Sequence, residues 1–282
     1  MPDREWGSDI VEVDAYLERI GYRGQLTTSL STLRALHRAH VDTIPFENVD
    51  VVLRRPIALD LAALQAKLIE RRRGGYCYEH NLLFGALLER LGFGVTRLAA
   101  RIRMGGDKVL PKSHMCLAVE AEGQRWFADV GFGGEGLLEP IPLHVDATAT
   151  QGVWTYRLAP DDIDGGWRLQ SHHADGWFDL YTFTGEPQHL VDFEVVNYYA
   201  STHPRSPFVA GLVVQRADEQ VRHTLHNTRL TAAGPDGVVD RRKLADDELP
   251  SVLERTVRPG AAGRRHHRTP PRSDHQDRGS NT

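Results

Sequence analysis

Residues 74–104 read GGYCYEHNLLFGALLERLGFGVTRLAARIRM. Over 77–91 the apolar residues recur every three or four positions, which predicts an amphipathic helix that begins near Cys77. Gly92 follows this run, and glycine is the residue that most often ends a helix. Over 95–104 the apolar residues alternate with polar ones, which is typical of a half-buried strand. The stretch therefore predicts that helical structure gives way to β structure just after Gly92.

The part of the chain that precedes this stretch is predicted to be helical. Apolar positions at helical spacing indicate three further helices, over 10–20, 33–41 and 61–73. Ser29 or Ser31 can cap the second of these helices and Asp60 the third, which is expected to stop at the paired glycines that open the quoted stretch. The segment 1–93 is therefore expected to form a helical domain.

Beyond Gly92 short strands are predicted at regular spacing. Alternating patterns lie over 95–104, 115–120, 126–130, 154–158, 167–170 and 177–183. Glycine and aspartate turns separate them, which is typical of a small antiparallel barrel or sandwich over 94–207. A mixed segment over 208–257 has strand patterns at 211–216 and 224–230, a turn at 234–237 and a short helical pattern near 246–254.

Length and composition agree with a folded α+β protein. The chain has 282 residues, which suggests about two domains and still allows one large or three small ones. Residues 258–282 contain six Arg, three His, three Pro and two Asp, but no Val, Leu, Ile or aromatic residue. Such a segment has no apolar side chains with which to build a core, so we expect a disordered basic tail.

Charge and cysteine content exclude several classes of function. The 34 basic and 38 acidic side chains give a net charge of −4, which argues against a general role in binding nucleic acid. The two cysteines cannot form a disulfide framework and have no zinc-ligand spacing, so we expect no metal and a reducing compartment. The N-terminal residues have no apolar signal region. We therefore expect a soluble, cytoplasmic protein without a membrane partner.

Cys77 is the strongest candidate for a nucleophile. A thiol at a helix N-terminus faces unpaired backbone N–H groups and the positive end of the helix dipole, and both favour the thiolate. The glycines before it permit a sharp turn that would leave the sulfur open to a substrate. Taken alone, however, a single cysteine is more often a small buried hydrophobe. Cys116 is the weaker candidate, because it lies in the middle of a predicted strand.

A predicted hairpin brings a histidine and an aspartate together. If Glu122 and Gly123 form a two-residue turn, the strands on either side pair so that His114 and Asp129 are diagonal neighbours on one face. A three-residue turn would place them on opposite faces, so the inference depends on the register. With Cys77, this pair would supply the nucleophile, base and orienting group of acyl transfer.

The residues around Cys77 resemble a known family. The run 72–81, RRGGYCYEHN, is similar to the signature of the arylamine N-acetyltransferases. Four other segments match the pattern of this family in the same order: 15–22 (AYLERIGY), 43–48 (TIPFEN), 129–134 (DVGFGG) and 198–204 (YYASTHP). The resemblance covers residues from about 16 to 230.

The resemblance implies a fold and a reaction. It implies a helical first domain, a β-barrel second domain and an α/β third domain that acts as a lid, in an arrangement like that of the cysteine proteases. It assigns the catalytic triad to Cys77, His114 and Asp129. Acetyl-CoA would donate an acetyl group to an arylamine, arylhydrazine or N-hydroxyarylamine by a ping-pong mechanism through an acetyl-cysteine.

The resemblance also implies which residues surround the substrates. By position in the family's pattern, the walls of the acceptor pocket would be Phe46, Ile102, Ser113, Phe132 and His203. Gly133 and Gly134 would contact the CoA donor. The chain departs from the family's pattern after about Thr256, where the usual terminal helix is replaced by the Arg- and His-rich segment, so we expect a shortened lid.

Other functions remain open from the residues alone. A Cys-His-Asp triad also serves hydrolases and transglutaminase-like amidases, and an amide synthase that uses another acyl donor would share the fold. A binding protein with a disabled site is a further alternative, and an unreactive Cys77 would identify it.

Overall fold

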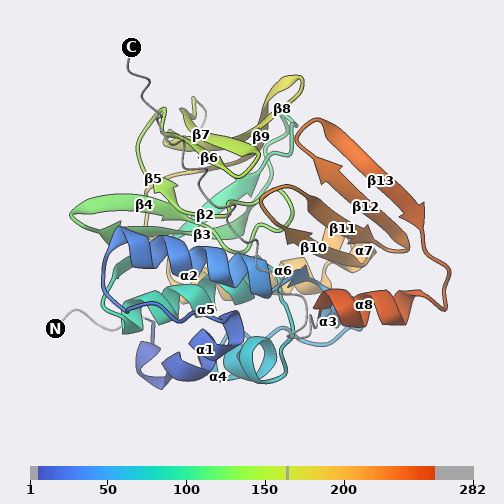
Figure 1. Cartoon of the computed structure of the whole chain (residues 1–282), viewed down its shortest axis with the longest axis horizontal. Coiled ribbons are helices and arrows are strands. Elements are labelled where there is room, and N and C mark those ends of the chain that lie inside the picture. The colour runs from blue at the N-terminus through green and yellow to red at the C-terminus, as the bar shows by residue number, and fades with distance from the viewer. Residues whose placement is uncertain (1–5, 163–164, 258–282) are drawn as a thin grey trace, which may run out of the picture.

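Three layers make up the part of the chain that the structure describes. The computed structural model describes residues 6–162 and 165–257. Helices from the first part of the chain lie below an eight-stranded sheet, and a five-stranded sheet lies beside both (Figure 1). The fold class is therefore α+β, as predicted, with helices, an antiparallel barrel and a further sheet with its own helices.

The first layer is built from two helices of 14 residues each and several shorter ones. Its members are η1 (Ser8–Ile10), α1 (Val13–Ile20), α2 (Leu30–Thr43), α3 (Val49–Val52), α4 (Leu61–Leu64), the π-helical turn η2 (Gln65–Glu70) and α5 (Cys77–Arg90). Ser29 caps α2 and Asp60 caps α4 through hydrogen bonds to backbone N–H groups, as predicted. All residues of α5 from Cys77 to Leu88 are buried, because this helix contacts β2 and β3 as well as α4.

The second layer is an almost closed antiparallel barrel. Its strands are β2 (Gly94–Ile102), β3 (Lys112–Ala121), β4 (Gln124–Ala128), β5 (Ile141–Pro142), β6 (Thr148–Gln151), β7 (Trp154–Pro160), β8 (Trp167–His173) and β9 (Gly176–Phe183). They are hydrogen-bonded in the order β5-β4-β3-β2-β9-β8-β7-β6. Aromatic side chains such as Phe127, Trp154 and Tyr181 are buried in its interior. The interior is thus a packed core.

The third layer draws its first strand from the helical part of the chain. Its strands are β1 (Phe46–Glu47), β10 (Val213–Ala217), β11 (Arg222–His226), β12 (Arg229–Gly234) and β13 (Gly237–Lys243). They are paired in the order β1-β10-β11-β12-β13, and α8 (Leu249–Val257) covers one face. The helices α6 (Leu190–Thr202) and α7 (Pro207–Ala210) connect the barrel to this sheet.

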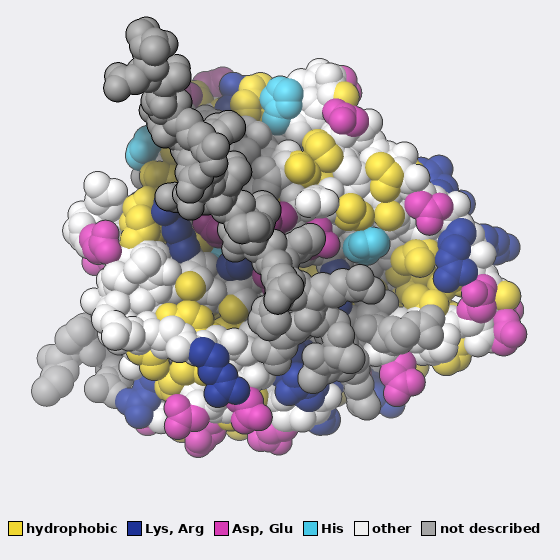
Figure 2. Space-filling model, viewed as in Figure 1, with side chains coloured by type: hydrophobic (Ala, Val, Ile, Leu, Met, Phe, Trp, Pro, Cys, Tyr) yellow, Lys and Arg dark blue, Asp and Glu magenta, His cyan; other side chains and the backbone are white. Residues whose placement is uncertain are grey.

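Charges of both signs are interspersed on the surface seen in Figure 2. Basic and acidic side chains lie next to one another over the five-stranded sheet and below the helices. Arg242 and Glu248, for example, form an exposed ion pair of 2.9 Å between β13 and the segment before α8. This face therefore carries no large region of one charge.

Several sequence expectations need correction. Ile10 is half exposed, because it lies in a separate 3₁₀ turn and not on the buried stripe of α1. The third helix ends at Glu70, well before the paired glycines, and an extended segment follows. The strand expected over 224–230 is two strands, because Asn227 adopts a positive φ of 54° and turns the chain. The last helix begins at Leu249, later than expected.

The helix α6 was not predicted at all. Its apolar residues occur on every side, so no single stripe marks it as a helix. Val191, Val195 and Tyr198 are exposed, whereas Phe193 is buried. The limits predicted for the separate domains stay predictions, and the predicted tail 258–282 lies outside the described residues.

Candidate active site

Cys77 is the first residue of α5 and is buried. The residue is only 3% exposed, so its sulfur is buried, whereas the sequence predicted a sulfur open to a substrate. The glycines before it also act differently from expectation, because neither adopts a positive φ. A Cβ atom on Gly74 would overlap the carbonyl oxygen of Pro45, and one on Gly75 would crowd the side chain of Glu79. Glycine is needed here for close packing of the backbone.

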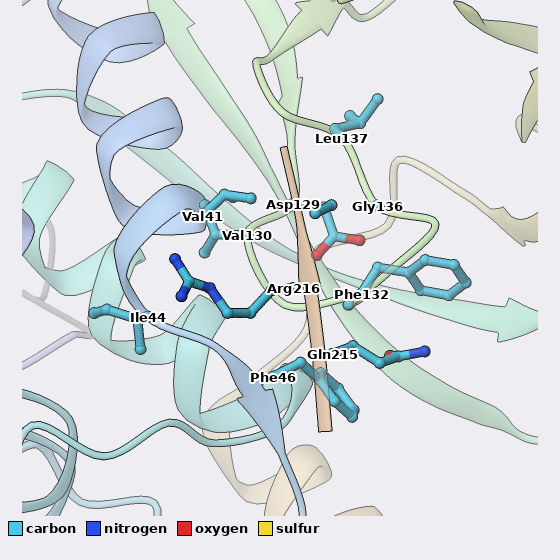
Figure 3. A pocket seen from close by; sticks show the side chains of 12 residues that line it. Val41, Ile44, Phe46, Asp129, Val130, Phe132, Gly136, Leu137, Gln215 and Arg216 are labelled. Atoms are coloured by element: carbon cyan, nitrogen blue, oxygen red, sulfur yellow. The ribbon is translucent and has the colours of Figure 1, made fainter. Parts of the chain in front are cut away.

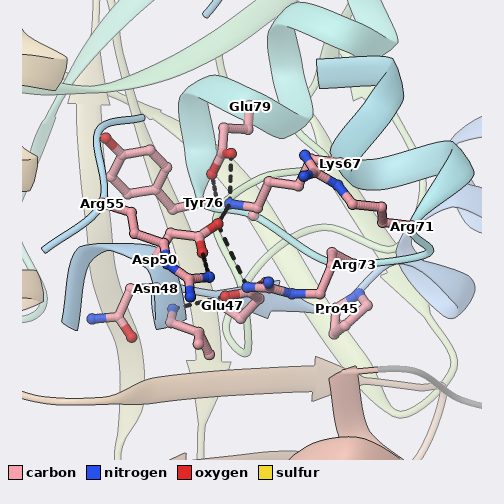
Figure 4. Close-up of polar contacts among 12 residues, drawn as sticks. Pro45, Glu47, Asn48, Asp50, Arg55, Lys67, Arg71, Arg73, Tyr76 and Glu79 are labelled. Atoms are coloured by element: carbon pink, nitrogen blue, oxygen red, sulfur yellow. Dashed lines mark hydrogen bonds and ion pairs between the residues drawn. The ribbon is translucent and has the colours of Figure 1, made fainter. Parts of the chain in front are cut away.

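A buried cluster of ion pairs holds the segment that leads into α5 (Figure 4). Arg73 pairs with Glu47 at 2.6 Å, and Lys67 pairs with Glu79 at 2.7 Å and with Asp50 at 2.9 Å. Each carboxylate here has a cationic partner, which offsets the cost of removing the charges from water. The cluster joins β1, α3, η2 and the start of α5 around the position of Cys77.

The β3–β4 hairpin has the predicted register. Glu122 and Gly123 form a two-residue turn with φ of 53° and 74°, and Ala121 pairs with Gln124. Asp129 follows the end of β4, and its carboxylate lies 2.7 Å from Nε2 of His114. The diagonal contact expected from the sequence is therefore present.

The carboxylate of Asp129 is fixed by four hydrogen bonds. Besides His114, the hydroxyl of Tyr181 donates to Oδ2 at 2.6 Å. Nδ2 of Asn81 and the backbone N–H of Gly131 both donate to Oδ1 at 2.9 Å. Burial by itself would raise the pKa of Asp129, but the charge of His114 and these hydrogen bonds hold it below its usual value.

His114 is buried beside two aromatic rings and two polar partners. Burial by itself lowers the pKa of His114, but the charge and hydrogen bond of Asp129, together with a hydrogen bond and charge from Cys77, raise it to about 10. Because Nε2 faces Asp129, Nδ1 is the nitrogen left for the thiol. The rings of Phe132 and Tyr181 lie 5.2 and 4.9 Å from the imidazole and fix its plane.

A small pocket lies next to Asp129, between α2, β1, β10 and the loop after β4 (Figure 3). Phe46, Phe132 and Gly133, three of the residues predicted to contact substrates, line it. Gln215 also lines the pocket. It lies so close to Gly133 that a Cβ atom added to this glycine would collide with the Gln215 amide. The pocket is therefore mostly apolar, with a few polar groups at its edge.

The other predicted contact residues lie outside the lining of this pocket. Ile102 ends β2 opposite Tyr181 and is partly buried against the barrel core. Ser113 is half-buried, and its carbonyl oxygen accepts a hydrogen bond of 2.8 Å from Tyr78. His203 ends α6 and stacks on Tyr199. Their roles stay predictions.

Gly134 also lies outside the pocket lining, although its neighbour Gly133 is part of it. The backbone N–H of Gly134 donates to Oε1 of Gln215 at 3.2 Å. This hydrogen bond connects the loop after β4 to β10.

Three residues of the site were not foreseen. Asn81 lies four residues after Cys77, so helical spacing places both on one face of α5, and this was the signal that could have revealed it. Its amide also donates to the carbonyl of Met115 at 2.7 Å and so joins the helix to β3. Tyr181 and Gln215 come from distant strands, and no local pattern marks them.

Residues 6–162 and 165–257 make up the described part of the chain. Within these ranges no group of three or more His, Cys, Asp or Glu side chains is arranged to hold a metal ion. Within the same ranges no helix combines the length and the apolar composition needed to cross a membrane.

Comparisons with known proteins identify the family of the chain. A family model for N-acetyltransferases matches residues 29–258. The arylamine N-acetyltransferase of Mycolicibacterium smegmatis is 43% identical over 226 residues, which are 78% of this chain and 82% of that protein. The solved structure of the Mycobacterium abscessus arylamine N-acetyltransferase has a TM-score of 0.85 at 37% identity, and the match covers 91% of this chain and 93% of the other. That of the Mycobacterium marinum arylamine N-acetyltransferase in complex with CoA has a TM-score of 0.80 at 35% identity, over 86% of this chain and 91% of the other. The chain therefore belongs to the arylamine N-acetyltransferase family.

Proposed function

We propose that this protein transfers the acetyl group of acetyl-CoA to an arylamine, arylhydrazine or N-hydroxyarylamine through an acetyl-cysteine on Cys77. The observation that carries the proposal is the 2.7 Å contact between His114 and Asp129, with Cys77 at the start of α5 near enough to help raise the pKa of His114. Family membership supports the reaction class, and the structure of the relative from M. marinum was solved with CoA.

The triad would hold Cys77 as a thiolate next to an imidazolium. The raised pKa of His114 means that the imidazole readily keeps a proton taken from the thiol. Asp129 stabilises this positive charge and fixes the ring through Nε2, so Nδ1 carries the proton that faces the sulfur. The nucleophile is thus prepared before substrate arrives.

In the first half-reaction the Cys77 thiolate attacks the carbonyl carbon of the acetyl thioester. The bond from this carbon to the CoA sulfur then breaks, and His114 gives its proton to the departing sulfur. The products are acetyl-Cys77, neutral His114 and free CoA. Backbone N–H groups at the start of α5 would stabilise the oxyanion, and one such donor is worth on the order of 3 kcal/mol in other enzymes.

In the second half-reaction the amine nitrogen attacks the acetyl carbon, and His114 accepts the proton that this nitrogen loses. The carbon–sulfur bond to Cys77 breaks, which releases the amide and restores the ion pair. The two substrates thus react in turn at one sulfur, which gives ping-pong kinetics. The rings of Phe46 and Phe132 on the pocket wall favour a flat aromatic acceptor.

The test is to incubate the protein with acetyl-CoA without amine and to record intact and peptide mass spectra. We expect one acetyl group on the peptide that contains Cys77, and its loss on addition of aniline. Cys77→Ala should abolish the adduct. Cys116→Ala is the matched control and should retain it, because Cys116 is buried within β3 and only donates to the carbonyl of Leu98.

Other outcomes would contradict the proposal in distinct ways. Steady release of CoA without an adduct or amine would indicate a thioesterase or related hydrolase. Neither an adduct nor CoA release would indicate a different acyl donor, as in an amide synthase, or a disabled site. Acetylation of Cys77→Ala at an unchanged rate would remove Cys77 from the mechanism.

A further inference from the structure

A chain of three buried polar side chains crosses the helical layer and ends on the backbone two residues before Cys77. The hydroxyl of Tyr16 in α1 is hydrogen-bonded to Nδ1 of His40 in α2. Nε2 of His40 lies 2.8 Å from Nδ1 of His80 in α5. Nε2 of His80 lies 3.0 Å from the carbonyl oxygen of Gly75 and 3.2 Å from that of Pro45. None of the three side chains is part of the mechanism above.

The end of the chain determines where every proton lies. A carbonyl oxygen can only accept, so Nε2 of His80 must carry a proton to bond with Gly75 and Pro45. In the neutral ring Nδ1 of His80 is then an acceptor, so Nε2 of His40 must donate to it. His40 in turn accepts from the Tyr16 hydroxyl. All donors therefore point in one direction, from Tyr16 towards Gly75.

Burial keeps the chain neutral and dry. Tyr16 and His40 have no exposed surface, and His80 is 1% exposed. Burial lowers the pKa of His80 to about 4, even though its bonds to the Pro45 and Gly75 carbonyls oppose this shift, and it also holds the pKa of His40 well below the usual value. Water cannot replace a lost partner here without opening the core.

The peptide group that this chain reaches is held on both sides. The carbonyl of Gly75 accepts from His80 and from the backbone N–H of Glu47, the latter at 2.7 Å. On the other side of the same peptide group, the N–H of Tyr76 donates to the Glu79 carboxylate at 3.0 Å. The next residue is Cys77, so the direction of this peptide sets the direction in which the thiol leaves the backbone.

We propose that the Tyr16–His40–His80 chain positions Cys77 by holding the ring of His80 against the Gly75 and Pro45 carbonyls. If His40 did not donate to Nδ1 of His80, that nitrogen would be a buried acceptor without a partner, and the ring could turn away from the two carbonyls. The Gly75–Tyr76 peptide would then lose one of its restraints. A shift of about 1 Å in a reacting atom can cost on the order of 100-fold in rate. The inference rests on Cys77 being the acetylated residue.

The test uses His80→Gln and His40→Leu, singly and together, in the full-length protein. Glutamine reaches the position of Nε2 with an amide N–H and has no second ring nitrogen that needs a donor from His40, so His80→Gln should retain at least half of the rate constant for acetylation of Cys77 by acetyl-CoA. His40→Leu should lower this rate constant about tenfold or more without changing the KM for acetyl-CoA. In the His80→Gln background, His40→Leu should lower it less than twofold.

Two controls separate positioning from general loss of stability. Leu33→Ala removes a buried side chain from the same helix as His40 and should lower thermal stability without changing the acetylation rate constant of the folded protein. Tyr16→Phe removes only the hydroxyl at the start of the chain and should reduce the rate constant less than His40→Leu does. All rates are measured below the unfolding transition of each variant.

Several results would overturn the inference. If His40→Leu lowers the rate constant equally in both backgrounds, His80 does not transmit its effect. If His40→Leu acetylates at the wild-type rate, the chain is purely structural. Both cases require that wild-type Cys77 becomes acetylated, so they are distinguishable from failure of the proposed function, in which the wild type itself forms no adduct.

Discussion

Asp129 shows how much of a site depends on partners that do not react. Of the four groups that donate to its carboxylate, only His114 would take part in proton transfer. Tyr181, Asn81 and Gly131 keep the carboxylate ionised and immobile within the interior. The imidazole therefore meets a negative charge in a defined direction, which is the condition for a stable imidazolium in a buried site.

The pH dependence of thiol reactivity tests this arrangement. Against the effect of burial, Asp129 and Cys77 raise the pKa of His114 to about 10, so the positive charge beside Cys77 should persist as the pH rises from 6.5 to 9. We expect the rate at which iodoacetamide alkylates Cys77 to change less than threefold over this range. In Asp129→Asn the charge that raises the pKa of His114 is absent, so the rate should increase with pH over the same range.

Peptide mass spectrometry at a series of pH values measures this alkylation. Asp179→Asn changes a carboxylate of β9 that pairs with Arg168 at 3.3 Å, and serves as the control with the wild-type profile. A wild-type profile in Asp129→Asn as well would exclude Asp129 as the source of the imidazolium.

At the scale of helices and strands, the local sequence was sufficient to predict the structure where a turn sets the pairing of two strands. Glu122 and Gly123 fix the register of one hairpin, and that register alone brings His114 to Asp129. Caps and glycines likewise marked an end of α1, α2, α4 and α5. The sequence could not reveal that β2 pairs with β9, which carries Tyr181. Six strands, β3 to β8, lie between these two in the sequence, so no local pattern connects them. The pairing of β1 with β10 is equally non-local.

Replacing a glycine by alanine should lower mainly the stability at Gly123 and the acetylation rate at Gly74. Gly123 needs its φ of 74°, but no atom lies within 4 Å of an added Cβ. Gly123→Ala should therefore lower the free energy of unfolding by about 1 kcal/mol and leave the acetylation rate of the folded protein within twofold. Gly74 has an ordinary φ, yet an added Cβ would overlap the Pro45 carbonyl. Gly74→Ala should lower the acetylation rate at least tenfold.

Urea unfolding and the rate of CoA release measure the two effects. Each variant is the control for the other, because one changes the backbone far from Cys77 and the other changes it three residues away. Equal losses of rate in both variants would contradict the view that Gly74 is required for close packing beside the nucleophile.

At the scale of the whole molecule, buried histidines should make stability depend on acid. Burial, partly offset by hydrogen bonds, lowers the pKa of His37 and of His80 to about 4, against about 6.5 when unfolded. Between these values the unfolded chain binds protons that the folded chain does not. Stability is thus fully present above pH 6.5 and is lost as the pH falls towards 4, by about 1.4 kcal/mol per pH unit for each such histidine.

The free energy of unfolding in urea from pH 7 to pH 4.5 measures this loss. His80→Gln removes one of the titrating groups, so its stability should fall less steeply than that of the wild type, by about 1.4 kcal/mol per pH unit. If the free energy of unfolding falls equally steeply with pH in both proteins, His80 is not kept neutral by the fold.

The strand order of the five-stranded sheet also sets an order in time. Protein synthesis delivers the chain from its N-terminus, and Cys77, His114, Asp129 and Tyr181 all precede Phe183, the last residue of the barrel. Strand β10 is made later. It pairs with β1 at Phe46 and contributes Gln215 to the wall of the pocket. A growing chain therefore contains Cys77, His114 and Asp129 before that wall exists. The pocket beside Asp129 can form only after the chain has been made as far as β10.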